Sequence, residues 1–168
     1  MRQKAIGIRA VVAGVAVVMV TDHTGAAQEA ARTPAPTTEA KVWAAEDLNK
    51  VAKDLLVTKA NNWSFYSEAT YNAEVRNLTG KQPVLQHKQR ADFMIMRDGG
   101  GTFVTGGELV GGKPQNNRGD LTGESIKGGV SRVVKAGDVI YIPPGVPHYF
   151  SNIPDHAAYT LVRWDISK

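Results

Sequence analysis

The sequence contains no cysteine among its 168 residues. This absence excludes disulfide bonds, thiolate zinc sites, iron–sulfur ligation and a cysteine nucleophile. Any bound metal must therefore be held by histidine, carboxylate or amide groups. Aromatic residues make up only 7% of the chain and charged residues 21%, whereas hydrophobic residues make up 42%. That balance is enough for one packed domain and argues against global disorder.

Long hydrophobic runs are also scarce. The main apolar run, Ala10–Val20, has 11 residues, well below the roughly 20 that a membrane-spanning helix needs. It follows a basic start, residues 1–9, and precedes the small residues Gly25-Ala26-Ala27, so that the three parts of a secretory signal peptide are present. We predict a signal peptide over residues 1–27, a secreted or periplasmic mature protein, and no stable membrane span in the mature chain. A buried strand or an uncleaved anchor is the alternative.

Part of the positive charge lies in this first segment. The chain has 20 Lys+Arg and 16 Asp+Glu, a net charge of +4, and removal of residues 1–27 leaves 17 and 15, a net charge of +2. So small a charge gives no reason to expect a nucleic-acid partner. Cleavage is predicted after Ala27, with Ala26 and Ala31 as alternatives.

Two further segments are predicted before the strands begin. Residues 28–40 indicate a flexible linker, because Ala, Thr and Pro dominate and no periodicity is present. A helix is expected next, capped by Thr37 or Thr38 with Glu39 in its first turn, and continuing to Leu56. Its apolar positions recur at helical spacing and should pack on a sheet: Val42, Trp43, Leu48, Val51, Ala52 and Leu55. Residues 41–168 are predicted to form one domain with this helix at its N-terminus.

From Trp63 onward the hydrophobic period changes to two, which is typical of strands. The 17 glycines and 8 prolines supply turn signals between short runs, with a turn predicted at Asp98–Gly101 and another at Pro143–Gly145. Evenly spaced short strands of this kind indicate an all-β sandwich or barrel. The expected strands include Tyr71–Arg76, Phe93–Met96, Thr102–Val104, Val130–Val134, Val139–Ile142 and Tyr159–Trp164.

The longest stretch without a pattern is Gly111–Gly129, which is polar and rich in glycine. A loop of this length in a compact domain is usually functional or mobile. We expect it near the mouth of the barrel, where it could act as a lid.

The strongest local pattern lies near the C-terminus. Gly137 opens a predicted strand, Pro143 and Gly145 form a turn, His148 follows three residues later, and Asn152 comes four residues after that. Proline fixes the backbone of such a turn and glycine adopts conformations that side chains forbid. This segment resembles the second motif of the cupin superfamily, G-x5-P-x-G-x2-H-x3-N, at every fixed position. The resemblance implies a small antiparallel jelly-roll β-barrel and casts His148 as a metal ligand.

The first cupin motif, G-x5-H-x-H-x3-4-E-x6-G, is only partly matched upstream. Asp92 stands where the motif has glutamate, and Gly99 closes the motif after six residues. Counting back from Asp92 makes His87 the second histidine and places Leu85 at the position of the first. In this alignment the metal ligands are His87, Asp92 and His148.

A second alignment of the first motif starts from its opening glycine. Gly80 would cast His87 as a displaced first histidine and Gln89 as the second ligand. The two alignments stay open at the level of sequence.

Two histidines and one carboxylate are a known way to hold a divalent metal with open positions for substrate or oxygen. The resemblance therefore implies a metal-dependent enzyme that acts on a small organic molecule and uses Fe, Mn, Ni or Zn. The alternative is a non-catalytic small-molecule-binding cupin with a degenerate site, which the leucine at position 85 favours. Cupins often pair through their sheets, so that a homodimer is also expected. Arg90 and Arg163 are candidates to bind a substrate carboxylate, although surface exposure is the favoured expectation for both.

Overall fold

The computed structural model describes residues 40–166. The predicted signal peptide and nearly all of the predicted linker lie outside these residues. Among the described residues, no helix combines the length and the apolar character that crossing a membrane requires. The elements are α1 (Ala45–Thr58), β1 (Asn62–Ser67), β2 (Tyr71–Leu78), β3 (Val84–Gln86), β4 (Arg90–Thr105), β5 (Glu108–Val110), β6 (Lys113–Pro114), β7 (Leu121–Gly123), β8 (Ser125–Lys127), β9 (Val130–Lys135), β10 (Val139–Ile142), β11 (His148–Asn152) and β12 (Ala157–Asp165).

The helix begins later than the sequence pattern predicts. Its first residue is Ala45, and the preceding Ala44 makes no side-chain capping bond. Trp43 comes before the helix in an extended segment, and its ring packs against Phe65 with 4.9 Å between the ring centroids. The predicted start was therefore wrong, because tertiary packing holds Trp43 on the sheet rather than on a helical turn.

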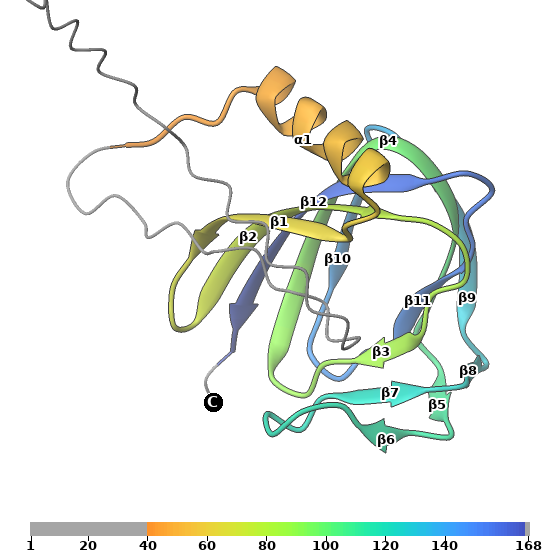
Figure 1. Ribbon diagram of the computed structural model, residues 1–168. Coiled ribbons are helices and arrows are strands. Elements are labelled where there is room, and N and C mark those ends of the chain that lie inside the picture. Colours follow the sequence, from red (N-terminus) through yellow and green to blue (C-terminus); the bar gives the residue numbers. More distant parts are fainter. Residues whose placement is uncertain (1–39, 167–168) are drawn as a thin grey trace, which may run out of the picture.

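The buried stripe of α1 covers the outer face of the sheet beneath it (Figure 1). Leu48, Ala52 and Leu55 are buried against Ala73 and Val75 of β2. Their spacing of four and three residues places all three on one side of the helix. The expectation that the stripe packs on a sheet is confirmed, except at Val42, which precedes the helix and is 86% exposed.

Two antiparallel sheets enclose the main core and share the long strand β4 (Figure 1). One sheet runs β1-β2-β12-β4-β10, and the other runs β6-β7-β3-β11-β4-β9. Strands β5 and β8 pair separately. No hydrogen-bonded ladder closes the sheets into a continuous barrel within residues 40–166. The predicted all-β, jelly-roll-type architecture with one N-terminal helix is confirmed.

The turn predicted at Asp98–Gly101 is instead a bend inside β4. At this point β4 passes from one sheet to the other. Gly99 has φ +63°, and a Cβ there would lie 2.1 Å from the carbonyl oxygen of His156. The glycines therefore permit a close backbone crossing at the corner of the sheets, which a side chain would block.

Alternation along β2 separates the apolar outer face from a polar interior. Val75 lies beneath the helix, whereas its neighbours Glu74 and Arg76 point the other way, toward the interior. Deeper in the interior the side chains are apolar, with Met94, Phe150 and others forming one core cluster. One end of the interior is thus lined by charged groups and the remainder by apolar ones.

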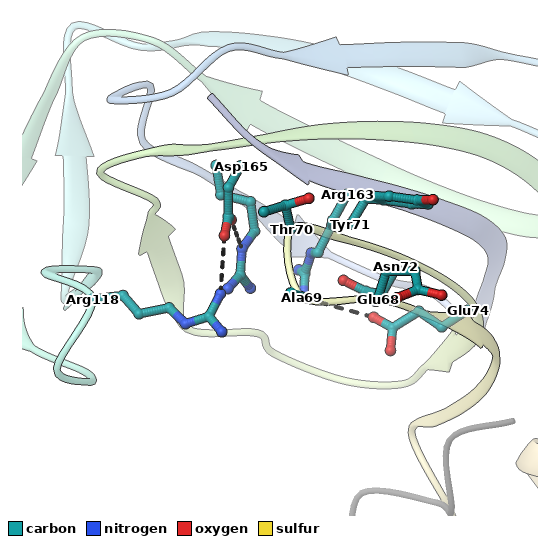
Figure 2. A pocket seen from close by; sticks show the side chains of 10 residues that line it. Glu68, Ala69, Thr70, Tyr71, Asn72, Glu74, Arg118, Arg163 and Asp165 are labelled. Carbon is teal, nitrogen blue, oxygen red and sulfur yellow. Dashed lines mark hydrogen bonds and ion pairs between the residues drawn. The ribbon is translucent and has the colours of Figure 1, made fainter. Parts of the chain in front are cut away.

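The stretch Gly111–Gly129 is more regular than predicted, because it contains β6, β7 and β8. It also contacts the C-terminal strand, since Nη1 of Arg118 lies 3.3 Å from Oδ2 of Asp165 (Figure 2). Pairing of β7 with β3 places the stretch beside the charged end of the interior, as expected. Its action as a lid stays a prediction.

Candidate metal centre

The turn Pro143–Gly145 places His148 at the start of β11. Gly145 has φ +80°, a conformation that side chains disfavour, and its backbone N–H donates to the carbonyl of His87 across 2.7 Å. This hydrogen bond joins the two motif segments. Strand β11 then turns the His148 ring into the interior, where it is buried.

Hydrogen bonding fixes the tautomer of His148. Its Nδ1 lies 3.0 Å from the carbonyl oxygen of Val146, and a carbonyl can only accept. Nδ1 therefore carries the proton, and Nε2 keeps its lone pair. That Nε2 atom lies 3.9 Å from Oδ2 of Asp92. The unprotonated nitrogen is therefore on the side of the ring that faces the other polar groups.

His87 follows β3 and lies close to His148, with 5.5 Å between the ring centroids. Its Nδ1 is 3.1 Å from Oδ2 of Asp120, and its Nε2 is 3.6 Å from Oδ2 of Asp92. Both ring nitrogens are buried, and neither makes a hydrogen bond of good geometry. A buried nitrogen without a partner is costly, and a metal ion at Nε2 would remove that cost.

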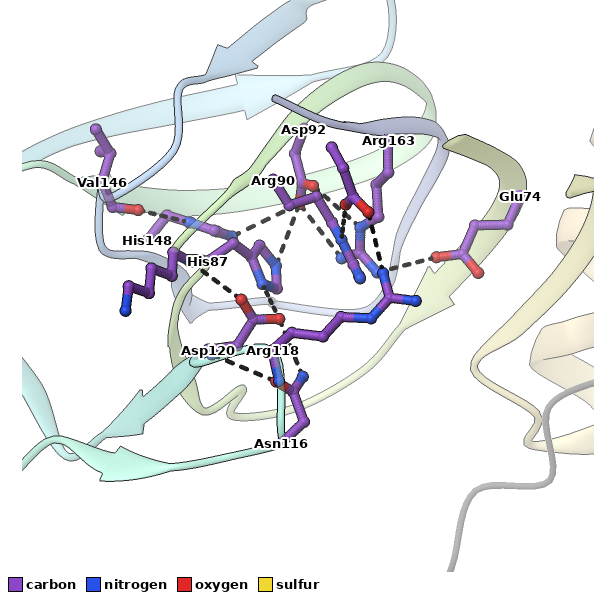
Figure 3. Close-up of polar contacts among 12 residues, drawn as sticks. Glu74, His87, Arg90, Asp92, Asn116, Arg118, Asp120, Val146, His148 and Arg163 are labelled. Carbon is purple, nitrogen blue, oxygen red and sulfur yellow. Dashed lines mark hydrogen bonds and ion pairs between the residues drawn. The ribbon is translucent and has the colours of Figure 1, made fainter. Parts of the chain in front are cut away.

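Asp92 connects the histidines to an arginine (Figure 3). The side chain is only 2% exposed. Its Oδ2 faces both imidazoles, while Nε and Nη2 of Arg163 donate to Oδ1 and Oδ2 across 3.0 and 3.3 Å. Arg163 also lies 3.6 Å from Glu74. The expected surface exposure of Arg163 was wrong, because β12 directs this side chain inward.

The three predicted ligands converge. One ligand atom from each of His87, Asp92 and His148 can be chosen so that all three lie within 4.8 Å of one another. Ligands about 2.1 Å from a shared ion lie roughly 3–4 Å apart, so that a small inward movement would complete the geometry. Two imidazoles and a carboxylate suit a divalent transition metal. The residues present therefore fit such an ion.

The protonation states also fit. Burial lowers the pKa of His148 to about 4, and burial is likewise the main cause of the lowered pKa of His87. Burial alone would raise the pKa of Asp92, but the charge of Arg163 and the two nearby histidines bring it below its usual value. At neutral pH the imidazoles are neutral and the carboxylate is ionised, as metal binding requires.

The structure separates the two alignments of the first motif. Leu85 pairs directly with His148 across β3 and β11 and lines the same cavity. Gln89 is exposed and lines a different hollow, with Arg90 and Asp165. The geometry therefore favours Leu85 as the first-histidine position and does not bring Gln89 to the other three predicted ligands.

Asp120 was missed by the sequence analysis. It accepts hydrogen bonds from the backbone N–H of Lys88 and from Asn116, and it faces His87. A carboxylate against the second nitrogen of a metal-binding histidine is a common means of orienting the ring. The polar loop containing Asp120 was the only available signal.

A cavity of about 370 Å³ opens beside this cluster. Asp92, His148 and Arg163 form part of its wall, and apolar side chains such as Leu85 and Phe103 form much of the rest. The volume is within the range of small-molecule sites.

These features define a class: a jelly-roll domain with a histidine–carboxylate cluster at the polar end of its interior. A family model described as "Cupin domain" matches residues 122–163. That match contains the complete second motif with His148, but neither His87 nor Asp92. No curated protein matches the chain in sequence.

Several solved structures are similar to this chain at low sequence identity. A protein from Bacillus halodurans has a TM-score of 0.51 and 11% identity, with 79% of this chain and 86% of that chain covered. A protein with a double-stranded β-helix domain from Klebsiella pneumoniae has a TM-score of 0.46 and 12% identity, with 76% of this chain and 91% of that chain covered. A cupin protein from Bacteroides fragilis has a TM-score of 0.39 and 13% identity, with 58% of this chain and 68% of that chain covered. Sequence similarity to a cupin domain is thus found over residues 122–163, and similarity of fold over the larger part of the chain.

Proposed function

We propose that the protein is a divalent-metal-dependent enzyme that acts on a small organic molecule, with His87, Asp92 and His148 as the metal ligands. The observation that carries this proposal is the convergence of three buried donors in their metal-binding protonation states, two of which, Asp92 and His148, line a cavity. Three protein ligands leave coordination positions for substrate or oxygen.

The chain's own residues would prepare the site. The bound metal would supply a Lewis acid or an oxygen-binding centre. The Val146 carbonyl holds the His148 ring, Asp120 faces the outer nitrogen of His87, and Arg163 keeps Asp92 ionised. The apolar cavity wall would limit the access of water to the reacting groups.

A non-catalytic binding protein is the second candidate, and one observation favours it. Leu85 occupies the place of a histidine ligand and presents an apolar side chain to the cavity. Such a protein would use the same cavity without turnover.

The deciding measurement is elemental analysis of protein purified without added metal. We expect near-stoichiometric transition metal in the wild type and none in His148→Ala. His156→Ala is the matched control, because His156 contacts Asp98 and Asp155 outside the cluster, and it should retain the metal. A wild type that stays metal-free after incubation with Fe, Mn, Ni and Zn would reject the enzyme proposal and support the binding protein.

The proposed location is the periplasm or the outside of the cell. The basic start, the apolar run and the small residues before Gln28 support it. Intact-mass measurement after expression in a host with a secretion system should place the new N-terminus close to Gln28. A soluble cytoplasmic product that keeps Met1 would contradict this proposal.

A further inference from the structure

We propose, resting on the function proposed above, that the substrate or ligand is a small organic acid with an apolar body, and that Arg76 binds its carboxylate. Arg76 is a residue that neither the motif nor the metal cluster includes. Three features of its surroundings support this role.

The first feature is its position. Arg76 lies on β2 and lines the cavity that Asp92 and His148 also line. It lines the adjoining hollow as well, together with His87 and Asp120. A small molecule held by Arg76 would thus lie next to the predicted metal ligands.

The second feature is the lack of a suitable partner. The Arg76 side chain is 22% exposed, and its Nε is buried without a hydrogen bond. Within residues 40–166 its one carboxylate neighbour inside 4.0 Å is Glu74, with 3.5 Å between Nε and Oε1. Glu74 is shared, because it also accepts a hydrogen bond from Asn62 and lies 3.6 Å from Arg163.

The contrast with Arg163 shows what Arg76 lacks. Arg163 makes a two-pronged contact with Asp92, the geometry in which guanidinium and carboxylate groups bind most strongly. Arg76 makes no such contact among the described residues. A guanidinium that is largely covered and has no full partner is poorly compensated for its lost hydration, and a ligand carboxylate would supply the missing acceptors.

The third feature is the rest of the wall. Phe103, Leu85, Met94 and Tyr149 line the same cavity. They would bury the apolar body of an acid, while the amides of Asn61, Gln82 and Gln115 on the same wall offer hydrogen bonds to its polar groups. The chemistry of the wall therefore favours an acid with a hydrocarbon or aromatic body.

Hexanoate and hexanamide are suitable probes, because they differ only in the charged head group. Binding to the purified protein is measured by isothermal titration calorimetry. We expect hexanoate to bind at least about tenfold more tightly than hexanamide, and Arg76→Gln to remove this preference while hexanamide affinity is unchanged. Arg132→Gln is the control, because Arg132 is exposed on β9, and it should keep the preference.

Two further variants keep the test decisive. Arg76→Lys retains the charge and should retain part of the preference, which guards against a general effect of Arg76→Gln on folding. His148→Ala should lose the metal but keep the preference, so that failure of the metal function and failure of carboxylate binding are distinguishable. Equal affinities for the two probes in the wild type, no binding of hexanoate at millimolar concentration, or an unchanged preference in Arg76→Gln would overturn the proposal.

Discussion

The substitution Leu85→His should create a third histidine ligand and tighten metal binding. Leu85 and His148 are direct partners across two antiparallel strands, so that their side chains emerge on the same face with Cβ atoms about 4.5–5.5 Å apart. Two imidazoles at that spacing can reach nitrogens roughly 3–4 Å apart, which is the separation on a shared ion.

The size of the effect follows from two opposing contributions. Leu85 is half-buried, so that replacing it should cost about 1 kcal/mol of folding stability. A new ligand that raises zinc affinity at least about tenfold would contribute about 1.4 kcal/mol of binding free energy. Without metal, the variant should therefore be slightly less stable than the wild type. Added zinc should raise the free energy of unfolding of the variant by more than it raises that of the wild type.

Zinc affinity is measured by competition with a chromophoric chelator, and unfolding by urea titration with and without zinc. Gln86→His is the matched control, because the next residue on a strand points to the opposite face and Gln86 is outside the cavity wall. Unchanged zinc affinity in Leu85→His, or an equal gain in Gln86→His, would refute the alignment that places Leu85 at the first-histidine position.

Three further outcomes are expected. Asp92→Asn should abolish metal binding and lower the free energy of unfolding by about 3–5 kcal/mol, because Arg163, whose side chain is only 13% exposed, loses its carboxylate partner. Urea titration measures this change, and a variant as stable as the wild type would show that the ion pair does not stabilise the fold. The metal-free protein should lose stability as the pH falls from about 6.5 to about 4, because His148 takes up a proton at a higher pH in the unfolded chain than in the folded chain. Midpoints of urea unfolding across this pH range measure the loss, and they should depend less on pH in His148→Gln. Asp120→Asn should weaken metal binding about 10–100-fold by releasing His87 from its orienting contact. It should also lower the free energy of unfolding by about 1–3 kcal/mol, because an amide has one acceptor oxygen and Asp120 accepts hydrogen bonds at both. Calorimetry with zinc measures the affinity, and an unaltered affinity would show that the contact does not orient His87.

The sequence by itself determined the fold class and one half of the site. The second motif is local: Pro143, Gly145 and His148 lie within six residues, and the turn they form follows from the backbone preferences of proline and glycine. The strand pattern was equally local, since alternation reports which side chains of a strand share a face. Local signals were misleading where tertiary contacts override them, as at the bend of β4 around Gly99.

The tertiary structure decided which residues meet at the cluster. Asp92 and Arg163 are 71 residues apart in the chain, and Asp120 reaches His87 from a loop with no recognisable motif. Strand register alone brings Leu85 rather than its neighbours opposite His148, and a shift of one residue would turn the opposite face inward. Register depends on the pairing of strands distant in sequence, which is why only the folded chain could show the partners of the motif residues.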